Sequence, residues 1–297
     1  MTNPAVVFAR EFDACFRSLT RLSPHGEIAL FRAMRCALVG LNNQFKIEEY
    51  HGNSHQVIFT GNGNYARTNA CCELSDLMII TYSKNPPRAR LTYLQAKFER
   101  TTVPNLCMRQ FSANLEQWFL LSRRPIINGK GAFDPPADLL KAALLPSIGS
   151  FAFFYKDNTG DIQIYYTTAN YLRHQQQNPP RRSSPKYGKL QARGPCRVNC
   201  NAGYKECRAS CGNQSFAESL YRLEIGTPVD KSITQAQQTR NWLAAHLRAI
   251  QEARRSDLAE ELREILVPDT EELEVAPGFF GAKSLIIIKS NFEVRHG

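Results

Sequence analysis

The sequence has little that would place it in a membrane or in a secretory pathway. Across 297 residues, the longest apolar runs, such as SLIIIK near the C-terminus, are far shorter than the roughly 18 residues of a membrane-spanning helix. Arg10, Glu11 and Asp13 interrupt the first apolar stretch, which therefore does not resemble a signal peptide. We expect a soluble, cytoplasmic protein with no membrane partner. Its nine cysteines are then expected to be free thiols or metal ligands rather than disulfides.

Several familiar catalytic patterns are also missing. There are no internal repeats, and neither a serine nor a cysteine hydrolase motif is present. The glycine-rich stretch GNGN at 61–64 lacks the lysine and the following helix of a phosphate-binding loop. With 43% hydrophobic and 22% charged residues, however, the chain is long enough to bury a sizeable core and is not disordered as a whole.

Acidic residues are scarce in one part of the chain. Lys and Arg number 37 against 27 Asp and Glu, a formal net charge of +10, and between positions 173 and 208 nine basic residues face only Glu206. A local basic segment favours nucleic acid as a partner, although an exposed loop without a partner has the same composition. The candidate contacts to nucleic acid are Arg181, Arg182, Lys186, Lys189 and Arg193.

Hydrophobic periodicity predicts a mixed α/β fold. Helices are expected over 4–21, 24–42 (with Ser23 as N-cap), 105–122 and, as one helix or a pair, 230–266. Strands are expected within 45–61, over 77–82, 89–99 and 148–156, just after the turn at 157–160, and within 276–296. We therefore predict a core over 1–170, a basic linker with a four-cysteine module over 171–215, and a helical and strand region over 216–297 that packs on the core.

Polar residues interrupt two neighbouring apolar strands. Asp76 opens the strand at 77–82, and Gln95 and Lys97 lie near the end of the next strand. Because side chains alternate along a strand, Gln95 and Lys97 share a face, and hairpin pairing would bring Asp76 beside Gln95. Such groups are costly to bury unless they are paired or bind an ion. The alternative is an ordinary salt bridge with a glutamine at the edge.

Ser75–Asp76 and Gln95–Ala96–Lys97 together resemble the motif of the PD-(D/E)xK nuclease superfamily, to which many restriction endonucleases belong. The resemblance covers roughly residues 20–170. It departs from the family pattern in having Ser for Pro and Gln for the second acid. It implies a restriction-endonuclease-like fold, with a mixed sheet flanked by helices. It also implies a DNA endonuclease that depends on Mg²⁺ or Mn²⁺, with a role in restriction or phage defence.

The resemblance also assigns roles to residues. Asp76 would be the main metal ligand, joined by the side-chain oxygen of Gln95 and the carbonyl of Ala96. The ion would activate a water and neutralise charge on the phosphate, while Lys97 would orient that water.

Because Gln95 is neutral, we expect a second carboxylate to join Asp76 in binding the metal ion. Glu27 is the first candidate for this ligand and Glu73 is the second. Gln117, in the following predicted helix, either contacts the phosphate or the metal shell or lies on a solvated face. Cutting both strands of DNA would need two active sites and so implies a homodimer. The sequence leaves open whether an activating ligand or partner is needed.

Four cysteines, Cys196, Cys200, Cys207 and Cys211, lie within sixteen residues. Four thiolates suit a structural tetrahedral Zn²⁺, and each Cys-x3-Cys pair could lie on one helical face. Packed thiols, a disulfide or an iron–sulfur cluster are the alternatives. The sequence thus predicts a nuclease with a zinc-stabilised basic insertion. The alternative functions are a non-catalytic, zinc-containing nucleic-acid-binding protein with a decayed nuclease core, and a protein-interaction module that uses 230–266.

Overall fold

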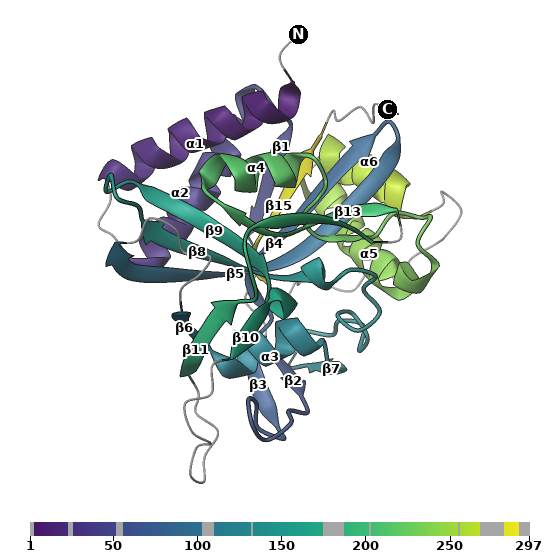
Figure 1. Ribbon diagram of the computed structural model, residues 1–297. Helices are drawn as coiled ribbons and strands as arrows, with labels where there is room; N and C mark the ends of the chain where they lie inside the picture. The colour runs from purple at the N-terminus through teal and green to yellow at the C-terminus, as the bar shows by residue number, and fades with distance from the viewer. Residues whose placement is uncertain are drawn as a thin grey trace.

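The structure is a computed structural model that describes residues 3–22, 26–51, 56–102, 110–131, 133–174, 187–201, 203–254, 256–267 and 282–290. A nine-stranded mixed sheet forms its centre, and helices flank it (Figure 1). The predicted mixed α/β class is confirmed at this level. Among the described residues, none of the helices combines the length and the apolar character that crossing a membrane requires.

Six helices are described. They are α1 (Pro4–Leu22), α2 (Glu27–Val39), α3 (Leu115–Arg123), α4 (Asn213–Tyr221), α5 (Gln237–Arg254) and α6 (Asp257–Leu266). The first two and the α5–α6 pair confirm the predicted helices. α2 begins at Glu27, directly after Gly26, whereas the predicted N-cap Ser23 lies outside the described residues. Single 3-10 turns lie at Gly40–Asn43, Pro146–Ile148, Ala169–Tyr171 and Thr234–Ala236.

The main sheet draws its strands from both ends of the chain. In order across the sheet they are β1 (Ile47–His51), β15 (Ala282–Lys289), β4 (Ser75–Lys84), β5 (Pro87–Thr102), β8 (Gly149–Lys156), β9 (Ile162–Thr168), β13 (Tyr204–Cys211) and β12 (Arg197–Asn201), with β14 (Thr227–Pro228) also pairing with β5. The pairs β15–β4 and β5–β8 are parallel, whereas β4–β5 is antiparallel. Strands from all three predicted regions therefore belong to one sheet.

Two smaller sheets lie beside the main one. One has the order β10 (Leu172–His174), β11 (Tyr187–Ala192), β6 (Gln110–Asn114), and the other β3 (Ala70–Glu73), β2 (Gln56–Phe59), β7 (Ile127–Gly129). The predicted helix over 105–122 is wrong over its first described part. Burial alternates along β6, with Phe111 and Ala113 inside, which is the strand period. α3 starts only at Leu115, because the Asn114 side chain caps it by accepting from two backbone N–H groups.

The alternation of side chains along β4 gives the sheet a core on each face. Leu77 and Ile79 pack with residues of α1, α2 and α4. Met78 and Ile80 pack on the other side with residues of α3, α5 and α6. The central strands are therefore covered on both faces, and any polar side chain on them is withdrawn from water.

Candidate active site

The β4–β5 hairpin brings Asp76 and Gln95 together, as the sequence predicts. Leu77 pairs with Leu94, so the residues just beyond this pair lie side by side. The Gln95 side-chain amide donates a hydrogen bond to Asp76 Oδ2, and the Ala96 backbone N–H donates to the same oxygen at 3.0 Å. Asp76 is only 6% exposed and Gln95 only 4%. Both polar groups are thus buried and partnered, which offsets the cost of removing them from water.

Gln117 on α3 completes a chain of amides that ends at Asp76. Its side-chain N–H group donates to Gln95 Oε1 and, at 3.4 Å, to the carbonyl of Glu73. Gln117 is buried, so the interpretation of a solvated helix face is wrong. In this arrangement Gln95 turns its nitrogen, not its oxygen, toward Asp76. If the side-chain amides of Gln95 and Gln117 both turned by 180°, the hydrogen bond between them would persist with donor and acceptor exchanged. Gln95 Oε1 would then lie on the Asp76 side.

Lys283 is a site residue that the sequence analysis did not identify. Its Nζ donates to Asp76 Oδ1 at 2.7 Å and lies 3.3 Å from Glu73 Oε2. Burial by itself would lower the pKa of Lys283, but the carboxylates of Asp76 and Glu73 raise the pKa above its usual value. The ammonium is therefore charged and balances Asp76. Parallel pairing of β15 with β4 places position 283 there, because Ala282 pairs with Ser75 and Ser284 with Leu77.

Lys97 and Glu27 contact each other. Lys97 Nζ lies 2.9 Å from Glu27 Oε1, and the lysine side chain is only 17% exposed. Glu27 is the first residue of α2, where a carboxylate is favoured by the helix dipole. The predicted second acid thus lies beside β5 and holds the lysine. Its partner in this structure is Lys97.

The oxygen atoms around Asp76 are of the kind that binds Mg²⁺, but together they carry only a small negative charge. Within the described ranges, no three or more His, Cys, Asp and Glu side chains form a group able to hold a metal ion. The predicted set supplies one carboxylate, from Asp76, with the amide oxygen of Gln95 and the carbonyl of Ala96. Both Asp76 oxygens already accept hydrogen bonds. A cation could join this set once Lys283 leaves Oδ1 and the Gln95 amide turns.

The four cysteines of the predicted zinc module do not come together. Their segment forms the antiparallel β12–β13 hairpin instead of helices, with a shift of register between Arg197 and Val198. Cys196 and Cys211 pack against the core on one side of the sheet, whereas Cys207 belongs to the core on the other side. Cys196 and Cys211 form a disulfide with a Cα–Cα distance of 6.3 Å. Cys207 is buried in the core beneath α1, α2 and α4, and Cys200 is exposed. The structure thus has one disulfide, which was among the alternatives for these cysteines, and two free thiols, Cys200 and Cys207.

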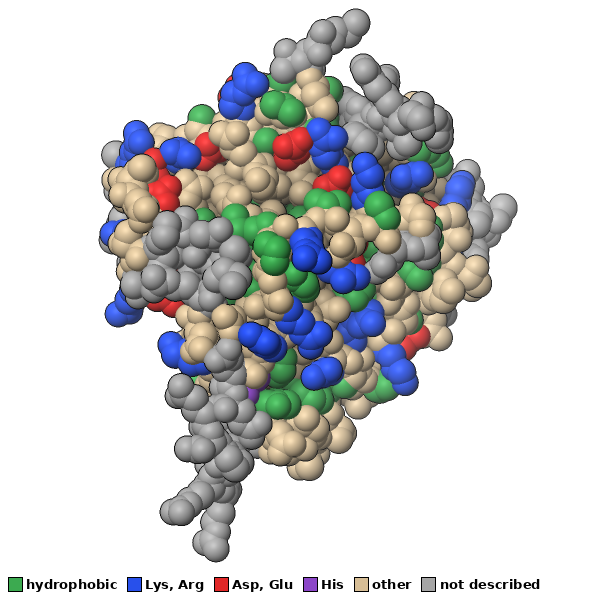
Figure 2. Space-filling model, in the orientation of Figure 1, with side chains coloured by type: hydrophobic (Ala, Val, Ile, Leu, Met, Phe, Trp, Pro, Cys, Tyr) green, Lys and Arg blue, Asp and Glu red, His purple; other side chains and the backbone are tan. Residues whose placement is uncertain are grey.

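Basic side chains gather on one surface of the molecule. Figure 2 shows Lys and Arg side chains in the middle of this face, over the region of β12 and β13 in Figure 1. Lys189 and Arg193 are exposed, as are Arg197 and Lys205, and in the described parts of the chain none of the four has a carboxylate within ion-pair distance. The remaining predicted contacts, Arg181, Arg182 and Lys186, lie outside the described residues.

Comparisons of the chain with protein-family models, with curated proteins and with solved structures found no match.

Proposed function

We propose that the chain is a metal-dependent DNA endonuclease with a restriction-endonuclease-like core. The observation that carries this proposal is the position of Asp76, Gln95 and Lys97 next to one another, where the pairing of β4 with β5 stops. Among the main-sheet elements, the chain order α2, β1, β4, β5, α3, β8 agrees with the helix, three strands, helix, strand order of the resembled family. α3 connects β5 to the parallel β8, so it covers the sheet where Gln117 reaches Gln95.

The chemistry assigns each side chain a task. Asp76, the Gln95 side-chain oxygen and the Ala96 carbonyl would hold Mg²⁺, which supplies an activated water and neutralises charge on the phosphate. Glu27 fixes the position of Lys97, whose ammonium then orients the attacking water and stabilises charge that builds on the phosphate oxygens. The exposed cations of β11–β13 would hold the DNA backbone.

Cleavage of plasmid and linear DNA with Mg²⁺ or Mn²⁺ tests this function. Asp76→Ala and Lys97→Ala are each expected to lower the cleavage rate about 100-fold or more, and EDTA should abolish cleavage. Asp134→Ala and Lys141→Ala are matched controls, because both remove an exposed charge elsewhere on the surface. Circular dichroism confirms that each variant is folded. Cleavage at the native rate in the Asp76 and Lys97 variants would contradict the proposal.

A second function is favoured by the ion pair at Asp76. Lys283 balances that carboxylate without a metal, and the neutral Gln95 donates to it. These two features fit a nuclease-like core that binds nucleic acid without cleaving it. Under this alternative, the native protein leaves every DNA substrate intact with either metal but binds DNA in a salt-sensitive manner.

A further inference from the structure

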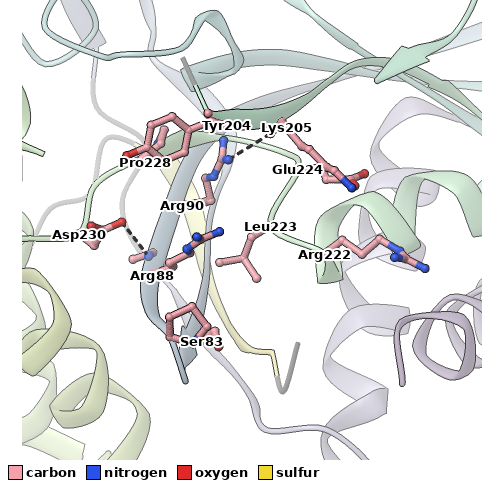
Figure 3. Close-up of a pocket in the computed structure, with 13 residues that line it drawn as sticks. Ser83, Arg88, Arg90, Tyr204, Lys205, Arg222, Leu223, Glu224, Pro228 and Asp230 are labelled. Carbon is pink, nitrogen blue, oxygen red and sulfur yellow. Dashed lines mark hydrogen bonds between the residues drawn. The ribbon is translucent and has the colours of Figure 1, made fainter. Parts of the chain in front are cut away.

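Three segments from distant parts of the chain line a cavity of about 240 Å³ (Figure 3). The β4–β5 hairpin contributes Arg88 and Arg90, the β12–β13 hairpin contributes Tyr204 and Lys205, and the segment after α4 contributes residues 222–230. Gln95 lies five positions after Arg90 on β5, which at about 3.3 Å per residue is roughly 16 Å. The cavity is therefore separate from the candidate active site.

Arg90 carries a buried positive charge at the wall of this cavity. It is 7% exposed, and its guanidinium donates to two neutral acceptors, the carbonyls of Gly226 at 2.7 Å and Lys205 at 3.1 Å. It also lies over the Tyr204 ring, 5.5 Å from the centroid. Burial lowers the pKa of Arg90 to about 10. None of the described carboxylates comes within ion-pair distance of it, but the charges of Glu206 and Asp230 act on it from farther away and raise its pKa against the effect of burial.

Two further cations share the cavity with Arg90. Arg88 lies two residues earlier on the same strand, and its positive charge opposes that of Arg90. Lys205 lies in β13, and its own backbone carbonyl accepts the hydrogen bond from Arg90. Both residues are exposed, and Figure 3 shows Arg88 extended toward Leu223 in the space between the loops. Glu206 and Asp230 act on Arg90, and Glu224 acts on Lys205, from beyond ion-pair distance, so these acids balance part of the positive charge and a bound anion would balance more of it.

Two acidic residues, Asp230 and Glu224, line the cavity and offset part of its positive charge. Asp230 accepts from the Ser232 N–H at 3.2 Å and from its hydroxyl, and lies 3.5 Å from the Ala89 N–H. Burial raises the pKa of Glu224, and the charges of Arg222 and Lys205 oppose that rise. The fourth cation, Arg222, pairs with Glu218 and turns away from Arg88 in Figure 3. The lining has four basic side chains, Arg88, Arg90, Lys205 and Arg222, against two acidic ones, Glu224 and Asp230, so its net charge is positive.

The wall of the cavity is firmly held. Leu223 and Gly226 both have positive φ, 55° and 93°, and a Cβ at Gly226 would lie 2.7 Å from the carbonyl oxygen of Leu91. Only glycine allows this close approach of the loop to β5. A left-handed backbone costs energy at a residue such as Leu223 and persists only where the surrounding structure holds it in place. The loop is thus fixed against the strand that carries both arginines, so the cavity is formed before a ligand arrives.

We propose that this cavity binds the phosphate group of a small phosphate monoester, with Arg88, Arg90 and Lys205 as its cationic contacts. Arginine and lysine are the usual protein partners of phosphate. A volume of about 240 Å³ lies just below the roughly 300–1,000 Å³ of common ligand pockets, so it suits one phosphate with one small organic group. Such a group is found on a free mononucleotide and at the 5′ end of a DNA strand. The proposal does not rest on nuclease activity.

Calorimetric titration in EDTA, which prevents metal-dependent cleavage, tests the site with defined probes. The probes are inorganic phosphate, deoxyadenosine 5′-monophosphate, deoxyadenosine, and a short duplex with or without 5′-phosphates. We expect the 5′-monophosphate to bind at least tenfold more tightly than deoxyadenosine. Arg88→Ala and Lys205→Ala should each weaken that binding at least fivefold. Arg90 stays unchanged, because its hydrogen bonds hold two loops together.

The matched control is Arg10→Ala, which removes an exposed charge from α1 and should leave the affinity unchanged. If deoxyadenosine 5′-monophosphate binds more tightly than the 5′-phosphorylated duplex, the ligand is a mononucleotide. If the 5′-phosphorylated duplex binds more tightly than the unphosphorylated duplex, and both cavity variants lose this difference, the ligand is a DNA end. The proposal is overturned if no phosphate-bearing probe binds, if deoxyadenosine binds as tightly as its monophosphate, or if Arg10→Ala weakens binding as much as the cavity variants do.

Discussion

At the scale of single residues, the neutral Gln95 determines how the candidate site is held without a metal. An amide can donate to Asp76, whereas a carboxylate in its place would repel it. Lys283 supplies the positive charge that a buried carboxylate requires. Asp76 is consequently satisfied by Gln95, Ala96 and Lys283 together. A metal ion at this site has to compete with those donors.

Gln95→Glu should make the site depend on metal. The new carboxylate lies beside that of Asp76 and loses the hydrogen bond to it, so we expect a loss of about 1–3 kcal/mol of stability without metal. Mg²⁺ relieves this repulsion and should raise the melting temperature of the variant more than that of the native protein. Thermal unfolding across a Mg²⁺ titration measures both effects. Gln44→Glu, which adds the same charge at an exposed position, is the control. An equal response of Gln95→Glu and Gln44→Glu to Mg²⁺ would contradict this prediction.

Short-range pairing explains which site residues could be predicted from sequence. Asp76 and Gln95 are joined by one hairpin, so alternation and a turn are enough to place them together. Lys283 lies 207 residues from Asp76 and reaches it only because β15 inserts between β1 and β4. No local pattern in AKSLIIIK specifies that neighbour. The burial of Gln117 likewise depends on how α3 packs on the sheet.

At the scale of elements, Glu261 ties α6 to the main sheet. Its carboxylate accepts from the Tyr82 hydroxyl at 2.8 Å and lies 2.7 Å from Lys289 Nζ and 3.4 Å from Lys84 Nζ. Burial alone would raise the pKa of Glu261. The hydrogen bonds from Lys289 and Tyr82, with the charges of Lys289 and Lys84, outweigh burial and lower the pKa to about 2. One side chain thus joins α6 to β4 and β15.

The lowered pKa of Glu261 predicts how stability responds to acid. In the unfolded chain this carboxyl titrates near its usual value, so its contribution is fully present above about pH 4.5 and is lost as the pH falls toward 2. Glu261→Gln should cost about 1–2 kcal/mol at neutral pH and flatten the fall in stability between pH 4.5 and 2. Urea unfolding at a series of pH values measures this. Glu260→Gln, exposed on the same helix, should keep the native slope, and a matching loss there would argue against the assignment.

Helices and strands could be predicted where the apolar residues of a segment followed a single helical or strand spacing. The apolar strands β4, β8 and β15 and the amphipathic α5 and α6 lie where the pattern predicts them. The segments 110–114 and 197–211 show the opposite case. Gln110–Asn114 has both helical and strand spacing, and its pairing with β11 decides for the strand. In 197–211, the spacing of the cysteines would also allow each pair to share one face of a helix. Pairing with β9 instead makes β13 a strand of the main sheet.

At the scale of the whole molecule, the net charge of +10 is unevenly distributed. Exposed cations of β11–β13 and the turns between them, namely Lys189, Arg193, Arg197 and Lys205, supply positive charge that no carboxylate among the described residues balances at ion-pair distance. A partner with regularly spaced negative charges would release counterions for each cation it contacts. The dependence of affinity on salt therefore reports how many of these residues touch DNA.

Lys189→Ala combined with Arg193→Ala should reduce the salt dependence of DNA binding without changing the fold, because both side chains are exposed. Each phosphate contact contributes about −0.9 to the slope of log K against log salt, so losing two contacts should make the slope shallower by about 1.8. Fluorescence anisotropy of a labelled duplex in EDTA, across a range of salt concentrations, measures the slope. Arg10→Ala with Lys141→Ala removes the same charge from other exposed positions. If this control changes the slope as much, DNA responds to the total charge of the protein and not to this surface.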